Sequence, residues 1–200
     1  MIKGIVLFVL VLMTNLAIAQ NGKGLEALPK GSIAPAFSAK NQFDKIVNSK
    51  DLLSSGSVVL IFYRGAWCPY CKKHIHKMQE GFQHILSENA SVVVVTPEKP
   101  EYIEKMISKT KAQFSILHDE DYKIMEDYHV KYTIKKEDKM AFKGYVLQKT
   151  KKHNAADEAV LPVPATYIIS PDGKIKYVHF DTNYKKRASL EDILKELKTK

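Results

Sequence analysis

The chain contains two cysteines, Cys68 and Cys71, which stand three residues apart within the sequence Trp-Cys-Pro-Tyr-Cys. The apolar run Val58–Tyr63 precedes them, and a segment with helical spacing follows. A strand that leads into C-x-x-C and then a helix places a thiol at a helix N-terminus, where the helix dipole and free N–H groups stabilise a thiolate. Thiolates attack disulfides and peroxides, so this pair predicts redox chemistry.

The two cysteines are expected to have different roles. Cys68 should lie exposed at the start of the helix and act as the nucleophile. Pro69 suits the first helical turn, where its missing N–H costs nothing and its fixed φ starts the helix. Cys71 should lie one turn further in and more buried, so it is predicted to resolve the mixed disulfide by closing an internal one.

Three neighbours are candidate supporting residues. Trp67 is predicted to form an apolar wall beside the thiols, although as the single tryptophan it also suits a core position. Arg64 precedes Cys68 by four residues and would add positive potential; an exposed arginine without a role at the site is the alternative. Tyr70 lies between the cysteines and is grouped with the substrate-binding or supporting residues.

Val163 and Pro164 form the second part of the predicted site. They come just before the apolar segment Ala165–Ile169, which should pass beside the cysteine loop. A cis-proline at this place would present the backbone to a substrate chain through β-type pairing, and X-Pro bonds are those that adopt the cis form. Pro162 is the competing candidate.

Two histidines follow the cysteines and raise a metal-binding alternative. His74 and His76 extend the motif to C-x-x-C-x-x-H-x-H, a set that suits copper or zinc. The second C-x-x-C of a zinc site is missing, and residues two apart on a helix do not share a face. Solvated helix histidines are therefore favoured, and no metal or other cofactor is expected.

The first 19 residues predict a cleaved secretory signal. Lys3 gives a positive start, residues 5–18 are mostly apolar, and Ala17-Ile18-Ala19 fits a cleavage site that leaves Gln20 as the new N-terminus. The apolar stretch is too short for a stable membrane anchor. We therefore expect an exported protein, in the periplasm of a Gram-negative bacterium, with a flexible leader at residues 20–30.

The charge distribution is strongly basic. The formal net charge is +9, and residues 131–153 hold eight lysines against Glu137 and Asp138. Nucleic-acid binding is one explanation, but this cluster lacks arginine and aromatic stacking motifs. A solvated lysine face on an inserted segment is the favoured interpretation, and it would steer an acidic partner rather than nucleic acid.

The order of the elements predicts an α/β thioredoxin-like fold over residues 31–200. Apolar runs predict strands at 58–63, 92–95, 114–117, 166–170 and 174–180. Helical spacing predicts a helix from Cys71 to about Ser87, further helices at 101–110 and 121–128, and a last helix capped by Ser189. This alternation implies a central mixed sheet flanked by helices, with an insertion at 130–160 before the C-terminal hairpin.

With these residues in place, the chain resembles the alkyl hydroperoxide reductase/thiol-specific antioxidant group, of peroxiredoxin-like type, within the thioredoxin-like superfamily. The resemblance rests on four stretches, at 31–37, 62–71, 161–173 and 181–197, the last of which includes Tyr184 and Arg187. It implies the fold, a thiol-dependent antioxidant or disulfide-exchange role, and Cys68 as the nucleophile. Its partners would be a protein disulfide or dithiol, or a hydroperoxide, together with an external thiol donor.

Two departures from that group favour disulfide exchange. Peroxiredoxins carry Thr or Ser three residues before the reactive cysteine, where this chain has Gly65, and an arginine where it has Val163-Pro164-Ala165. Those two groups bind and polarise the peroxide. We therefore predict an exported thiol–disulfide oxidoreductase. A thioredoxin-dependent peroxidase is the alternative, and a copper or zinc binding protein ranks below both.

Overall fold

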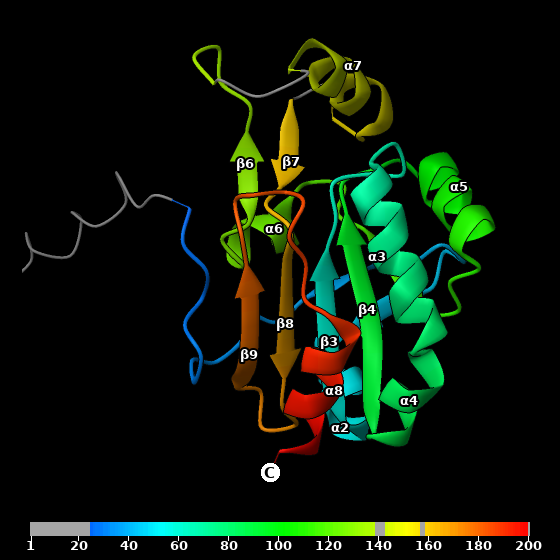
Figure 1. Ribbon diagram of the computed structural model, residues 1–200, viewed down its shortest axis with the longest axis vertical. Coiled ribbons are helices and arrows are strands. Elements are labelled where there is room, and N and C mark those ends of the chain that lie inside the picture. The colour runs from blue at the N-terminus through cyan, green and yellow to red at the C-terminus, as the bar shows by residue number, and fades with distance from the viewer. Residues whose placement is uncertain (1–24, 139–142, 157–158, 200) are drawn as a thin grey trace, which may run out of the picture.

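The computed structural model describes residues 25–138, 143–156 and 159–199, and a five-stranded mixed sheet forms its centre (Figure 1). The sheet has the order β5 (Ser115–His118), β4 (Ala90–Thr96), β3 (Ser57–Phe62), β8 (Ala165–Ile169) and β9 (Ile175–Phe180). Strands β3, β4, β5 and β9 run in one direction, and β8, which lies between β3 and β9, is antiparallel to both of these neighbours. The predicted mixed sheet and thioredoxin-like strand order are confirmed.

Helices cover both faces of this sheet because its central strands are apolar on both sides. On β3, Val59 and Ile61 pack into one core cluster, whereas Val58 and Leu60 pack into the other. The first cluster is covered by α3 (Pro69–Glu80), α4 (Phe82–Ser87), α5 (Pro100–Thr110) and α8 (Leu190–Lys198). The second is covered by α2 (Ser49–Ser55) and α6 (Lys123–Asp127), with the small sheet of β1 (Ser38–Lys40) and β2 (Ile46–Asn48) nearby.

The predicted helix from Cys71 to Ser87 is two helices, with Gly81 between α3 and α4. A Cβ atom at residue 81 would lie 2.3 Å from a methyl carbon of Leu190, at the start of α8. Glycine therefore lets α8 approach the joint closely. Ser189 caps α8 as predicted, since its Oγ accepts the Asp192 N–H at 3.0 Å.

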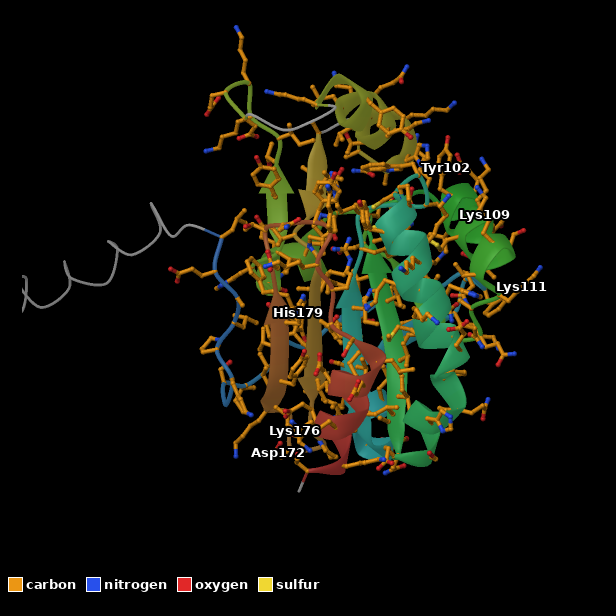
Figure 2. All side chains as sticks on the ribbon, viewed as in Figure 1. Tyr102, Lys109, Lys111, Asp172, Lys176 and His179 are labelled. Atoms are coloured by element: carbon orange, nitrogen blue, oxygen red, sulfur yellow. The ribbon has the colours of Figure 1, made fainter. Side chains whose placement is uncertain are left out.

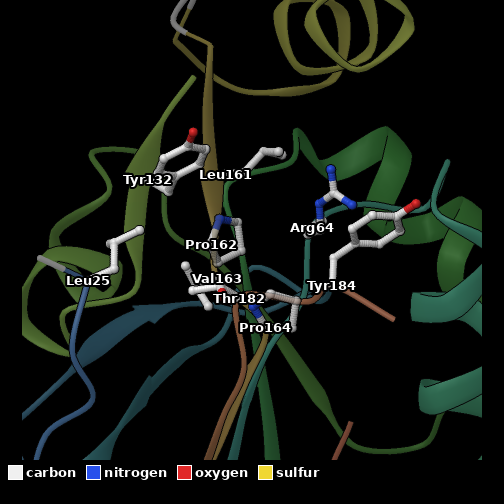
Figure 3. Close-up of a pocket in the computed structure, with 9 residues that line it drawn as sticks. All are labelled: Leu25, Arg64, Tyr132, Leu161, Pro162, Val163, Pro164, Thr182 and Tyr184. Atoms are coloured by element: carbon white, nitrogen blue, oxygen red, sulfur yellow. The ribbon is translucent and has the colours of Figure 1, made fainter. Parts of the chain in front are cut away.

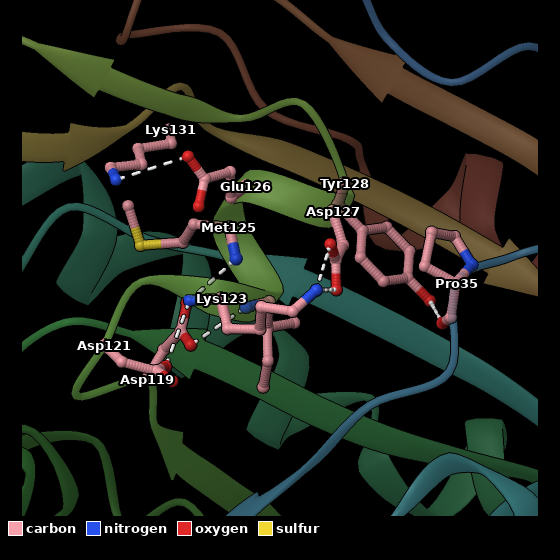
Figure 4. A network of polar contacts seen from close by, with 10 residues as sticks. Pro35, Asp119, Asp121, Lys123, Met125, Glu126, Asp127, Tyr128 and Lys131 are labelled. Carbon is pink, nitrogen blue, oxygen red and sulfur yellow. Dashed lines mark hydrogen bonds and ion pairs between the residues drawn. The ribbon is translucent and has the colours of Figure 1, made fainter.

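Helix α6 is held by Asp119, which follows β5. The Asp119 carboxylate accepts hydrogen bonds from the N–H groups of Ile124 (3.0 Å) and Met125 (2.8 Å), as Figure 4 shows. At the end of this helix, the Tyr128 hydroxyl donates to the Pro35 carbonyl at 2.8 Å. These contacts fix the segment that leads into the insertion.

The insertion forms a second layer of structure beyond one end of the central sheet (Figure 1). It consists of β6 (Lys131–Thr133), α7 (Lys143–His153) and β7 (Val160–Pro162), and β6 and β7 pair antiparallel. In the described residues α7 contains four lysines and no acidic residue. Val146 of this helix packs with Leu161 and Trp67, so α7 lies against the cysteine loop.

The predicted signal segment, residues 1–19, lies outside the described residues. Of the predicted flexible leader, residues 25–30 are described, and Leu28 packs against the second core cluster. No helix in the described ranges is both long and apolar enough to cross a membrane.

Candidate active site

The cysteine loop lies where β3 and β4 end. These parallel strands have their carboxyl ends at the same edge of the sheet, and α3 starts there with Cys68 as its N-cap and Pro69 in its first turn. Both cysteines are free thiols. The expectation that Cys68 is exposed is wrong, because only 2% of its surface is accessible, against 0% for Cys71.

The two thiols interact with one another, and Arg187 adds a positive charge. Its Nη2 lies 3.6 Å from the Cys71 Sγ. The hydrogen bond that the Cys68 thiol donates to Cys71, together with burial, raises the pKa of Cys68. Burial alone would raise the pKa of Cys71, but that hydrogen bond and the charge of Arg187 lower it to about 6. Within the pair, these directions give Cys71 the lower pKa, and the two thiols titrate together.

Arg64 and two aromatic rings cover the cysteine pair. The Arg64 guanidinium lies 4.5 Å from the ring centre of Tyr184 and 5.2 Å from that of Trp67. Tyr184 also meets Tyr70 edge to face at 5.7 Å. Arg64 is buried rather than exposed, and its charge favours ionisation of both thiols. Trp67 is half-buried and forms a wall of the site. The three predicted neighbours of the cysteines, Arg64, Trp67 and Tyr70, therefore lie together there.

A cavity of about 240 Å³ opens beside this cover (Figure 3). Its walls are mainly apolar, and the Arg64 guanidinium lies close to the Tyr184 ring at one side. The lining consists of Leu25, Arg64, Tyr132, Leu161, Pro162, Val163, Pro164, Thr182 and Tyr184. The predicted residues Val163 and Pro164 therefore share one cavity with Arg64.

The predicted cis-proline is absent. Every peptide bond in the described residues is trans, including those before Pro162 and Pro164. The Val163 N–H donates to the Val130 carbonyl at 2.7 Å, so it is already occupied by the insertion. This bond lies one residue beyond the antiparallel β6–β7 pair, and it uses a backbone N–H that pairing with a substrate chain would need.

The two histidines after the cysteines lie in different environments. His76 is exposed, as predicted, but His74 is buried, and its Nε2 lies 3.2 Å from the Ala188 carbonyl oxygen. Burial lowers the pKa of His74 to about 3, so its ring is neutral. Among the residues that the structure describes, no three His, Cys, Asp or Glu side chains gather as a metal site. The copper or zinc alternative therefore has no ligand set there.

Besides Tyr184 and Arg187, which were not predicted as site residues, Glu98 and His153 lie at the site and were not singled out from the sequence. Glu98, just beyond β4, is fully buried, and its Oε2 accepts the Ala66 N–H at 2.7 Å and the Tyr63 hydroxyl at 3.2 Å. Its Oε1 lies 2.8 Å from the Nδ1 of His153, at the end of α7. Burial raises the pKa of Glu98. The sequence did contain one signal for Glu98: this residue follows β4, and the carboxyl end of that strand lies at the same sheet edge as the cysteine loop.

Comparison of the sequence with known proteins finds one family and several thiol-dependent oxidoreductases. The model of the AhpC/TSA family matches residues 31–178. The thiol-disulfide oxidoreductase ResA of Bacillus subtilis (strain 168) is 24% identical over 153 residues, which are 76% of this chain and 68% of ResA. Peroxiredoxin Bcp of Escherichia coli (strain K12) is 27% identical over 106 residues, which are 53% of this chain and 67% of Bcp.

Solved structures support the fold. Peroxidoxin BcpB from Mycobacterium tuberculosis matches with a TM-score of 0.68 at 19% identity, over 85% of this chain and 96% of BcpB. A peroxiredoxin-like protein from Aquifex aeolicus matches with a TM-score of 0.64 at 18% identity, over 86% of this chain and 88% of the other. Both have the sheet and helix arrangement described above.

Proposed function

The chain belongs to the AhpC/TSA family, a thiol-dependent oxidoreductase family, and we propose that it catalyses thiol–disulfide exchange with Cys68 as nucleophile and Cys71 as resolving thiol. The observation that carries this proposal is the contact between the two thiols, with Arg187 3.6 Å from the Cys71 sulfur. A pair that already shares one proton is prepared to form an internal disulfide.

In the proposed reaction, the shared proton moves from Cys68 to Cys71 as a substrate disulfide arrives. The Cys68 thiolate attacks one substrate sulfur, forms a mixed disulfide and releases the other substrate sulfur as a thiolate. Cys71 then gives its proton to that released thiolate and attacks the Cys68 sulfur, so the internal disulfide forms and the second substrate sulfur leaves as a thiolate. Two electrons pass to the substrate, and an external thiol donor reduces Cys68 and Cys71 again.

Peroxide reduction is the second candidate because peroxiredoxin Bcp is among the relatives. The space at Gly65 argues against a fast peroxidase. A Cβ atom there would lie 2.3 Å from Trp67 Nε1 and 2.8 Å from Glu98 Oε1, so the hydroxyl side chain that peroxiredoxins carry has no room. Stopped-flow oxidation by hydrogen peroxide tests this, and we expect a rate no faster than that of a free thiol.

Oxidised glutathione is a suitable probe of the two cysteine roles. In Cys71→Ser, mass spectrometry should find one glutathione bound to Cys68; in the wild type that adduct should resolve to the internal disulfide. Cys68→Ser should take up glutathione far more slowly. If Cys71 in Cys68→Ser reacts as fast as Cys68 in Cys71→Ser, the assigned roles are reversed and the proposal fails.

The compartment is also part of the proposal. The predicted signal at residues 1–19 supports export to the periplasm, where disulfide substrates persist. A fusion of residues 1–30 to a reporter that is active only after export would test it. A reporter that stays inactive would contradict export.

A further inference from the structure

A buried carboxylate links the inserted helix to the cysteine loop. Glu98 has no accessible surface. One oxygen accepts the Ala66 N–H, two residues before Cys68, and the other meets His153 of α7. The same carboxylate therefore binds the loop on one side and the insertion on the other.

The end of α7 is fixed in place around this carboxylate. The His153 ring stacks on Tyr102 with 3.7 Å between centroids and 12° between planes. Figure 2 shows Tyr102 where α5 approaches α7. The Lys99 N–H donates to the His153 carbonyl at 2.8 Å, and the Ala155 N–H donates to the Pro97 carbonyl at 3.1 Å. His153 is thus held by its ring and its backbone.

We propose that Glu98 and His153 are positioning residues that hold the loop of residues 64–68 in its closed form and keep Cys68 covered. The inference rests on the proposed function, because the loop carries its nucleophile. Loss of the His153 contact leaves Glu98 Oε1 buried without that partner, and a buried polar oxygen without its hydrogen bond draws in water or moves. Either response shifts Ala66 and opens the loop.

The test uses the reduced full chain and needs no substrate. His153→Phe keeps a ring against Tyr102 but removes the contact with Glu98, and Glu98→Gln leaves one oxygen to serve donors on two sides. His84→Phe, at an exposed histidine of α4, is the matched control. Iodoacetamide labelling of each cysteine is followed by mass spectrometry at fixed pH under native conditions.

We expect Cys68 to react roughly tenfold faster in His153→Phe and Glu98→Gln than in the wild type, which is the effect of about one lost hydrogen bond. Cys71 should stay slow, and His84→Phe should match the wild type. Unchanged Cys68 rates would overturn the inference. So would a parallel increase at both cysteines, because that marks general unfolding rather than loop opening. If oxidised glutathione reverses the two cysteine roles while Cys68 labelling still responds, only the proposed function fails.

Discussion

Replacing Arg187 by glutamine tests whether this arginine keeps the resolving thiol ionised. Its Nη2 lies 3.6 Å from the Cys71 sulfur, and its charge is one of the causes that lower the pKa of Cys71 to about 6. Glutamine removes the charge while keeping a polar side chain. The hydrogen bond from Cys68 remains in the variant, so any change reports mainly the arginine.

The expected magnitude follows from the separation. Two unit charges at this distance attract by about 1 kcal/mol in water and about 5 kcal/mol at an effective dielectric constant of ~20. Cys71 is fully buried but Arg187 is only partly so, which places the interaction near 3 kcal/mol. That energy would raise the pKa of Cys71 from about 6 to about 8.

The ultraviolet absorbance of the thiolate, followed against pH, measures the first ionisation of the pair. Arg187→Lys should retain most of the low pKa because it keeps the charge. Lys186→Gln removes the same charge one residue away, where the side chain pairs with Asp181 at 3.3 Å, and should titrate like the wild type. The reasoning would be refuted if the titration midpoint of Arg187→Gln equalled that of the wild type. It would also be refuted if Arg187→Gln and Lys186→Gln had the same raised midpoint, because the effect would then not be specific to Arg187.

Two further predictions concern stability. Gly56→Ala should lower the free energy of unfolding by more than about 3 kcal/mol, since its Cβ would lie 2.0 Å from the Asn89 carbonyl oxygen. Gly144→Ala, with no atom within 4 Å, should be neutral or mildly stabilising; equal urea midpoints for both variants would contradict this. The pKa of Asp119 is raised from 3.8 to about 6, chiefly by burial, so the folded protein favours the protonated carboxyl. The stabilisation of the fold by this proton is complete below pH 3.8 and is lost as the pH rises through 6. Relative to Asp119→Asn, the wild type should lose about 3 kcal/mol of its free energy of unfolding between pH 4 and pH 7. If the free energies of unfolding of both proteins changed in parallel with pH, this prediction would be wrong.

The elements that the sequence predicts well are those whose signal is local. Strands β3 and β4 are continuous apolar runs because helices cover both of their faces, and Ser189 and Asp192 form a cap within one turn. The break at Gly81 was missed for the opposite reason. It depends on Leu190, which lies more than a hundred residues further along the chain.

The candidate site was predicted only in part, because its decisive contacts join distant segments. Glu98 is a single acidic residue in a polar turn, and nothing near it in sequence indicates a partner 55 residues away. Arg64 packs against Tyr184, which belongs to the loop between β9 and α8, far from Arg64 in sequence. The Val163 N–H likewise bonds to Val130, across an insertion whose strand pairing the sequence does not specify.

The loop between β9 and α8 carries both a residue that packs over Arg64 at the site and the arginine that lies beside Cys71. Tyr184 covers Arg64 from outside, and Arg187, three residues on, supplies the cation beside Cys71. A movement of this loop that lifted Tyr184 would also draw Arg187 away, and the loss of its charge would raise the pKa of Cys71. Arg64 comes from the end of β3 and stays beside Cys68, whose ionisation its charge favours. Such an opening would shift the shared proton toward Cys71 and the negative charge toward Cys68, so that the nucleophile would ionise as it became accessible.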